Sequence, residues 1–291
     1  MNKKAGIRNY YLKKHETNET INKSVLLNST IGLRNAGGSC YMASIVQILI
    51  HLEKFLDYFN IYKNTNELCK YFYKFLKDVE SAESSNKKYD RVIEIKPLSN
   101  RYHNINSKFK GTKGNNPMTF FIEFINDLNK DILSLFKGKK QIQFNGNKRI
   151  EEEDFIFYMI TLDEENAHIN EQLVNDNTKE FENIKDCTIT EKIKKCPEIL
   201  IINLEIDNIP YEGEDILMLL EPEMNYRLKA INKYDNVHSI AYIKIDEEWC
   251  EFDDSNCYSI DFDNIFDNNS RSNHIYNLFY ESYEEEEEQQ K

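Results

Sequence analysis

Three types of side chain that together can perform acyl transfer occur at separate points of this chain. Cys40 follows the segment Gly37-Gly38-Ser39 and begins a run with apolar residues at three- and four-residue spacing, which predicts an amphipathic helix. The glycines permit a sharp turn into the helix, and Ser39 is a good N-cap. The N–H groups and the positive end of the helix dipole favour a thiolate at Cys40, which is the nucleophilic form of cysteine.

A lone cysteine in a helix is more often a small buried apolar residue. A catalytic cysteine also needs a base and a group that orients that base. His238 opens the alternating run HSIAYIKI, which predicts a strand, and an acidic pair begins 15 residues later in WCEFDD. If 238–246 and 249–254 form a hairpin, Asp253 or Asp254 lies near His238. The sequence therefore predicts a histidine base beside an orienting carboxylate.

The elements that would position these groups change in type along the chain. Residues 1–30 are predicted to be a polar arm or an edge strand, with a weak apolar patch at Val25–Leu27. Helical spacing predicts helices over 40–60, 66–82 and 117–136, the last with Pro117 in its first turn. β-like runs then occupy 141–144, 154–162, 197–206, 226–234, 238–246, 249–254 and 274–282. Helices followed by strands indicate an α+β fold with a twisted antiparallel sheet.

Composition narrows the possible functions. The chain has 291 residues, 40% of them hydrophobic, which is enough for one large domain or two small ones. Its net charge of −13, from 50 acidic and 37 basic residues, argues against general nucleic-acid binding and favours a basic partner. The acidic runs at 151–154 and 284–288 are expected to be solvated, the second in a disordered tail over 284–291.

Neither a membrane span nor a secretory signal is predicted. The chain contains no long uncharged apolar run, and no apolar segment follows the positive charges of MNKKAGIRNYYLKKH. The expected location is therefore the cytoplasm, or the nucleus. The six cysteines, at 40, 69, 187, 196, 250 and 257, include no CxxC pair, so we expect reduced thiols rather than disulfides or a zinc site, and no cofactor. The histidines at 15, 51, 103, 168 and 274 are expected to be surface or packing residues.

Four segments together resemble the ubiquitin-specific proteases. GLRNAGGSCYMASIVQIL, 32–49, resembles their Cys box, GLxNxGNTCYMNSxLQxL, and HSIAYIKIDEEWCEFDD resembles their His box, GHYxAYxK followed by W and then FDD or FND. CPEILIINLEI resembles the PxxLxIxLxRF strand before the His box, and HIYNLFYE resembles the closing AYxLFY strand. All four occur in family order between residues 31 and 282, so the resemblance covers nearly the whole chain.

The resemblance implies a papain-like cysteine protease fold for residues 31–283, after the arm at 1–30. A helical thumb would occupy 31–140, and an antiparallel-sheet palm with reduced fingers would occupy 141–283. The implied reaction is hydrolysis of the isopeptide or peptide bond after the C-terminal Gly-Gly of ubiquitin, through an acyl-enzyme. The implied partners are ubiquitin or ubiquitin-conjugated proteins. The charge and the lack of a long apolar run predict no nucleic acid and no membrane as partners, and nothing in the sequence demands more than a monomer.

Residue by residue, the resemblance implies a catalytic role for five side chains. Cys40 would be the nucleophile and His238 the general base. Asp253 would orient the imidazole, and Asp254 would be a polar helper. Asn35 would donate an amide hydrogen bond to the oxyanion.

The chain also departs from the family pattern. Gly38-Ser39 replaces Asn-Thr, Ala43 replaces Asn, and Val237 and Ser239 replace the Gly and Tyr beside the histidine. The internal QDAxEF box is reduced to NNPMTFFIEF, without its Asp and Glu. These departures indicate a divergent member. They leave open a ubiquitin-binding scaffold of weak or no activity, a thiol hydrolase for another ubiquitin-like modifier, and a general papain-like peptidase.

Overall fold

The chain divides into two compact units, Met1–Leu133 with Glu251–Tyr258, and Ser134–Cys250 with Ser259–Lys291. The computed structural model describes residues 20–35, 37–85, 91–110, 114–144, 149–162, 169, 173, 177–180, 188–206, 216–218, 224–266 and 275–283. Within these residues, no helix is both long and apolar enough to cross a membrane.

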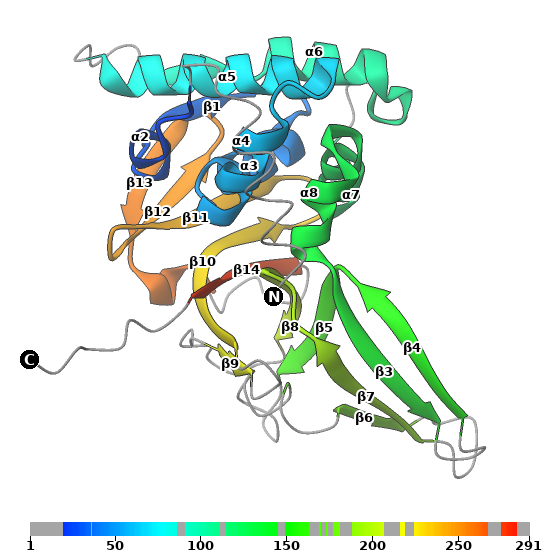
Figure 1. Ribbon diagram of the computed structural model, residues 1–291. Helices are drawn as coiled ribbons and strands as arrows, with labels where there is room; N and C mark the ends of the chain where they lie inside the picture. The colour runs from blue at the N-terminus through cyan, green and yellow to red at the C-terminus, as the bar shows by residue number, and fades with distance from the viewer. Residues whose placement is uncertain are drawn as a thin grey trace, which may run out of the picture. The chain divides into compact units, whose positions relative to one another are not determined.

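The first unit is mainly helical (Figure 1). Its helices are α2 Lys23–Leu27, α3 Cys40–Ile50, α4 Glu53–Tyr62, α5 Glu67–Ser84, α6 Lys96–Ile105, α7 Pro117–Leu128 and α8 Lys130–Leu133, with a 3-10 turn, η1, at Ser107–Phe109. Strands β1 Gly32–Arg34 and β2 Val92–Glu94 pair in parallel. All eleven residues of α3 are buried, so this helix lies inside the core of the unit.

The predicted helices are confirmed in type, but two of them are divided. The predicted helix over 40–60 is α3 and α4, because Leu52 is extended, with φ −94° and ψ 111°. The one over 117–136 is α7, α8 and the 3-10 turn η2, Ser134–Phe136, because Asn129 is extended. The expectation of an arm or edge strand was wrong at α2, where Leu26 is buried. Neither β2 nor α6 was predicted.

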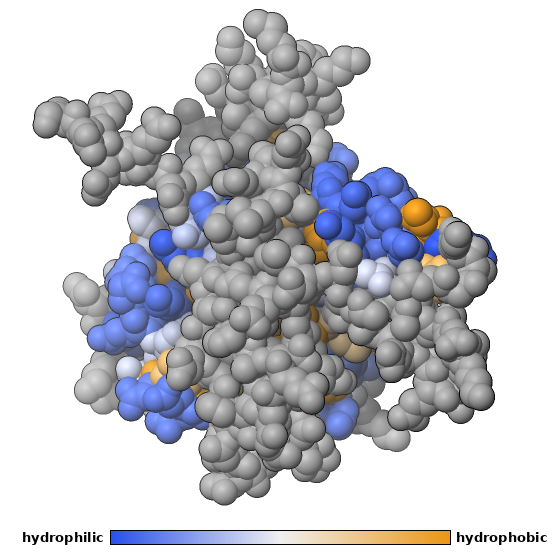
Figure 2. Space-filling view, turned by 90° about the horizontal axis from the view of Figure 1, so that it is seen from below, coloured by the Kyte–Doolittle hydropathy of each residue, from blue (hydrophilic) through white to orange (hydrophobic). Residues whose placement is uncertain are grey.

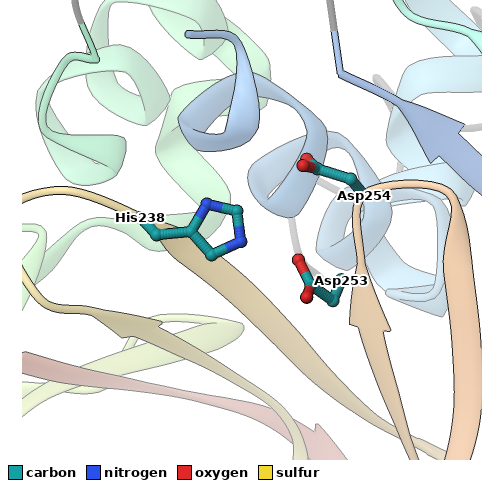
Figure 3. A group of neighbouring side chains, drawn as sticks. All are labelled: His238, Asp253 and Asp254. Carbon is teal, nitrogen blue, oxygen red and sulfur yellow. The ribbon is translucent and has the colours of Figure 1, made fainter.

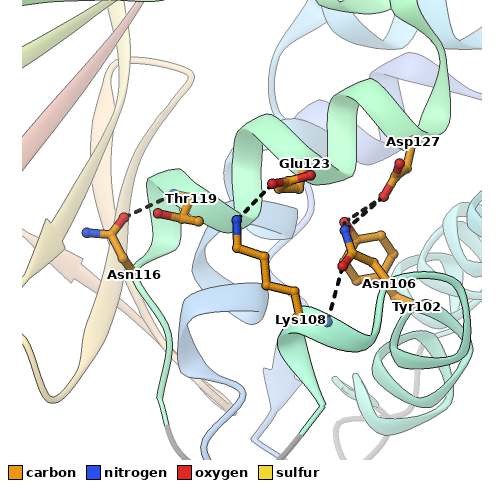
Figure 4. Close-up of polar contacts among 7 residues, drawn as sticks. All are labelled: Tyr102, Asn106, Lys108, Asn116, Thr119, Glu123 and Asp127. Atoms are coloured by element: carbon orange, nitrogen blue, oxygen red, sulfur yellow. Dashed lines mark hydrogen bonds and ion pairs between the residues drawn. The ribbon is translucent and has the colours of Figure 1, made fainter.

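Polar side chains join α6 and its following turn to α7 (Figure 4). The Tyr102 hydroxyl donates to Asp127 Oδ2 at 3.0 Å, and Asn106 Nδ2 donates to the same oxygen at 3.3 Å. Burial, and then the Asp127 charge, raise the pKa of Tyr102, which therefore stays a neutral donor. At the other end of α7, Asn116 Oδ1 accepts from the backbone N–H groups of Met118 and Thr119. The position of α7 is thus fixed at both ends.

The second unit is built on strands. These are β3 Gly138–Phe144, β4 Arg149–Phe155, β5 Phe157–Leu162, β6 Asn177–Glu180, β7 Thr188–Lys195, β8 Ile199–Ile206, β9 Ile216–Met218, β10 Met224–Tyr234, β11 Ser239–Ile245, β12 Glu248–Asp253, β13 Asn256–Ile260 and β14 Ile275–Tyr283, with a 3-10 turn, η3, at Phe262–Asn264. The larger sheet has the order β13-β12-β11-β10-β14-β8-β5, and β9 pairs with β10. A smaller sheet has the order β4-β3-β7-β6 (Figure 1). The division between the units passes through β12 and β13.

Most predicted strands are confirmed, with two corrections. The run at 154–162 is divided between β4 and β5, and β5 pairs with β8 in parallel, so the larger sheet is not wholly antiparallel. The predicted hairpin is β11 and β12, which are neighbours in the sheet and are joined by a two-residue turn at Asp246 and Glu247. Strands β6, β7, β9 and β13 were not predicted.

Strand β4, at the edge of the smaller sheet, carries the first acidic run. Glu152, Glu153 and Asp154 are exposed and Glu151 is half-buried, so the first acidic run is largely solvated, as predicted. The described residues on the face drawn in Figure 2 are mostly hydrophilic. The acidic tail at 284–288 and Cys187 lie outside the described residues.

We expect Asn66→Ala to lower the free energy of unfolding by about 1–2 kcal/mol, measured in urea. Asn66 Oδ1 accepts from Cys69 N at 2.8 Å, and Nδ2 donates to Leu128 O at 2.6 Å, so one side chain caps α5 and ties it to the end of α7. The control is Asn64→Ala in the same loop, which is exposed and should change stability by less than about 0.5 kcal/mol. Equal losses in the two variants would contradict this role.

Candidate active site

Cys40 is the first residue of α3, as predicted, and its residue surface is 3% exposed. The preceding turn needs its glycines, because Gly37 and Gly38 have φ values of +84° and +75°, which other residues rarely adopt. The turn therefore delivers the cysteine directly into the first turn of a buried helix.

The side-chain oxygen of Asn35 holds this turn together. It accepts from Gly37 N at 2.9 Å, from Ser39 N at 3.0 Å and from Ser39 Oγ at 3.0 Å. Ser39 does occupy the N-cap position, but its hydroxyl does not cap the helix, because it donates to Asn35 instead. Ser39 therefore occupies the predicted N-cap position, but its side chain does not form the capping hydrogen bond.

The same Asn35 side chain also binds the turn that follows β12. Its Nδ2 donates to Asp254 Oδ2 at 3.0 Å, and Leu33 N donates to Asp254 O at 2.7 Å. A Cβ atom on Gly32 would lie 2.2 Å from Ser255 O, so the close approach of β1 to this turn requires glycine. Hydrogen bonds and a close backbone contact thus attach Asp254 to the segment before Cys40.

Phe252, which precedes the acidic pair, is buried and packs on His51 with 5.4 Å between ring centroids. The imidazole of His51 is held by Gln47 O, 2.7 Å from Nδ1, and by Ser29 O, 2.9 Å from Nε2. Burial lowers the pKa of His51. His51 is a packing residue, as predicted, and it supports the strand that ends at Asp253.

A hydrogen-bonded pair beside the cysteine was missed by the sequence analysis. The hydroxyl of Tyr41, the residue after Cys40, lies 3.5 Å from His103 Nε2. Burial raises the pKa of Tyr41, and burial lowers the pKa of His103. No sequence signal pairs these residues, because His103 lies in α6, which was not predicted.

His238 lies in a tight connection between β10 and β11. Asp235 Oδ1 accepts from Val237 N at 2.9 Å and from His238 N at 2.6 Å, and Asp235 N donates to His238 O at 3.2 Å. Asn236 takes the left-handed conformation, with φ +69°. Asp235 was also missed, although an Asp-Asn pair after a strand is a turn signal.

Figure 3 draws the side chains of three predicted site residues, His238, Asp253 and Asp254. His238 offers ring nitrogens and the two aspartates offer carboxylate oxygens, and all three residues are half-buried. These atom types could also hold a metal ion. However, Asp254 already accepts a hydrogen bond from Asn35, and the residue types are also those of a histidine base with orienting carboxylates.

Comparison with protein families identifies the class. The sequence model of the family described as ubiquitin carboxyl-terminal hydrolase matches residues 31–280. The chain therefore belongs to the ubiquitin carboxyl-terminal hydrolase family, and the predicted papain-like α+β fold is confirmed. A comparison with curated protein sequences gives no match.

Solved structures of similar fold include two of one assembly. A SAGA DUB module of Ubp8, Sgf11, Sus1 and Sgf73 bound to monoubiquitin matches with a TM-score of 0.66 and 18% identity, over 97% of this chain and 76% of the matched chain. The same module bound to ubiquitin aldehyde matches with a TM-score of 0.63 and 17% identity, over the same shares. At this identity the similarity concerns the fold.

We expect Gly32→Ala to destabilise the protein by about 1–3 kcal/mol, because its methyl group would force β1 away from Ser255 and so disturb the Asn35–Asp254 contact. Thermal unfolding would measure this. Gly37→Asn is the control, because nothing lies within 4 Å of a Cβ at Gly37 and asparagine tolerates a positive φ. A Gly32→Ala protein as stable as the wild type would show that β1 and the turn do not depend on close contact.

Proposed function

We propose that this protein is a cysteine-type deubiquitinase, which hydrolyses the isopeptide or peptide bond after the C-terminal Gly-Gly of ubiquitin. The observation that supports it best is the Asn35 side chain, which holds the turn before Cys40 and also binds Asp254, in a member of the ubiquitin carboxyl-terminal hydrolase family whose cysteine begins a buried helix. Side chains of the required types therefore occupy the required elements.

In the proposed reaction, the Cys40 thiol transfers its proton to His238, and the thiolate attacks the carbonyl carbon of the terminal glycine. The imidazolium of His238 gives this proton to the leaving amine as the C–N bond breaks, which leaves a thioester on Cys40. His238 then takes a proton from water, and the resulting attack releases the glycine carboxylate and the thiol. Asp253 holds the imidazole in the tautomer and orientation that these transfers need.

Asn35 is the proposed donor to the oxyanion. An amide group has two N–H donors, and one of them is used by Asp254. The side-chain oxygen of Asn35 is fully engaged with the turn before Cys40, so the amide plane is fixed. A donor fixed in advance stabilises the developing charge without reorganisation.

Ubiquitin is the proposed partner, since two structures of similar fold contain ubiquitin or ubiquitin aldehyde. The net charge of −13 would favour approach of the basic C-terminal tail of ubiquitin. Both of those structures are assemblies with further subunits, whereas we propose that this chain acts as a monomer.

A second candidate function is ubiquitin binding without turnover. The observation that favours it is the burial of Cys40, which is only 3% exposed, since a nucleophile must reach its substrate. Replacement of the family's Tyr by Ser239 beside His238 points in the same direction. A thiol hydrolase for another ubiquitin-like modifier is compatible with the same residues.

We expect a ubiquitin probe with a thiol-reactive C-terminal warhead to form a covalent adduct with the wild-type protein and none with Cys40→Ala, as read by intact mass. Cys69→Ala is the matched control, because Cys69 is also buried and helical, and it should leave the adduct unchanged. Binding of ubiquitin without an adduct would favour the second candidate. Neither binding nor adduct would direct the assay to other ubiquitin-like tails.

We expect Asp253→Asn to reduce kcat on a fluorogenic ubiquitin substrate by about a hundredfold, and Asp254→Asn to reduce it less. Asparagine keeps the size of both side chains and tolerates the φ of +50° at Asp254, so the comparison isolates the charge. The reverse order would make Asp254 the orienting residue.

A further inference from the structure

A row of polar side chains crosses four neighbouring strands of the larger sheet and ends beside His238. Asn203 Nδ2, on β8, donates to Asn277 Oδ1, on β14, at 2.9 Å. Asn277 Nδ2 donates to Asn232 Oδ1, on β10, at 3.4 Å. Asn232 Nδ2 then donates to Ser239 Oγ, on β11, at 2.9 Å. We call these four residues the asparagine row.

Strand register places the three amides in line. Asn203 is directly opposite Asn277, and Asn277 is directly opposite Asn232. The residues adjacent to the row along the strands, Ile202 and Leu278 among them, belong to the apolar core. Because side chains alternate along a strand, the row lies on the other face of the sheet.

This row lies where apolar side chains would ordinarily be found. Asn232 is 0% exposed, and Asn277 and Ser239 are each 1% exposed. Their neighbours on the same face include Ile201, Phe279 and Ala230, which are all fully buried. Burial of an amide is unfavourable unless each polar atom is hydrogen-bonded, so an apolar face would be the simpler way to pack this sheet.

One backbone group fixes the direction of the whole row. Asn232 Nδ2 also donates to Ile240 O at 3.2 Å, and a carbonyl oxygen can only accept. The Asn232 amide therefore turns its oxygen toward Asn277, and Asn277 must turn its own oxygen toward Asn203. The amide dipoles then align along the row, and aligned hydrogen bonds strengthen one another.

The end of the row lies next to the proposed base. Ser239 follows His238 and is the first residue of β11, opposite Tyr234 of β10. The residues before His238 are held by Asp235, which accepts from His238 N at 2.6 Å. The backbone N–H of His238 is thus held by the Asp235 carboxylate, and the next two residues, Ser239 and Ile240, are held by Asn232 of the row.

We propose that the asparagine row is a positioning device for His238, which fixes the start of β11 and so the direction of the imidazole. The inference rests on the proposed function, because it gives His238 the role of general base. Misplacement of a catalytic group by about 1 Å can reduce a rate by about a hundredfold, so a remote row of this kind can affect turnover without touching the substrate.

The test replaces all three amides together, with Asn203→Val, Asn232→Val and Asn277→Val. A single replacement would leave a buried amide without its partner, whereas removal of all three amides together can be nearly neutral for stability, and valine suits a strand. We expect a similar unfolding midpoint, an unchanged KM for a fluorogenic ubiquitin substrate, and a kcat reduced by about ten- to a hundredfold.

Two further variants make the result specific. Ser239→Ala removes only the end of the row, keeps the Ile240 acceptor for Asn232, and should also reduce kcat with KM unchanged. Ile201→Val lies on the same face of β8, outside the row, and should leave kcat at the wild-type value. Long-range 1H–15N NMR detects the imidazole signals of His238, which are assigned as the signals that disappear in His238→Gln. These signals report on the imidazole without any need for turnover.

The outcomes separate the inference from the proposed function. A reduced kcat together with altered His238 imidazole signals in folded row variants would support the positioning role. Wild-type kcat and wild-type imidazole signals in the triple variant would overturn it and leave the row a packing feature. If the wild-type protein shows no turnover but the row variants alter the His238 imidazole signals, the positioning role is supported and the proposed function fails.

Discussion

The hydrogen bond from Asn35 Nδ2 to Asp254 Oδ2 joins two segments that are 219 residues apart in the sequence. The oxygen of the same Asn35 amide organises the turn that leads into α3, so one planar group fixes both the cysteine and the acidic turn. An amide is suited to this task because it donates and accepts at opposite ends of one rigid plane. The close approach of Gly32 to Ser255 then keeps the two segments in contact.

Amide side chains fix the positions of several elements in the described part of the chain. Asn66 ties α5 to α7, Asn116 caps α7, and the asparagine row crosses the sheet. Each amide has specific partners, and at Asn232 and Asn277 a displaced partner would leave a buried polar atom without its hydrogen bond. Specific geometry is therefore favoured over the many packings that apolar side chains alone would allow.

The departures from the family pattern also have a physical interpretation. Asn116 takes a position in the reduced internal box and still caps α7 with its side-chain oxygen, so the fold there does not need a carboxylate. Ser239 replaces a large aromatic residue with a hydroxyl group that accepts from Asn232. At Asn116 a hydrogen bond is present although the charged side chain of the family pattern is absent. At Ser239 a hydrogen bond is present although the aromatic ring of the family pattern is absent.

The sequence by itself determined the succession of a helical half and a strand-rich half, the family, the helix start at Cys40 and the β11–β12 hairpin, because these depend on local spacing and on motifs. It could not determine the break at Leu52 or the parallel pairing of β5 with β8, since both depend on packing between distant segments. The roles of Asn35, Asp235 and Asn232 in holding the site were also hidden, because a polar residue in a sequence does not identify its partner. Only the tertiary structure decided them, by placing each amide or carboxylate against the specific groups that it binds.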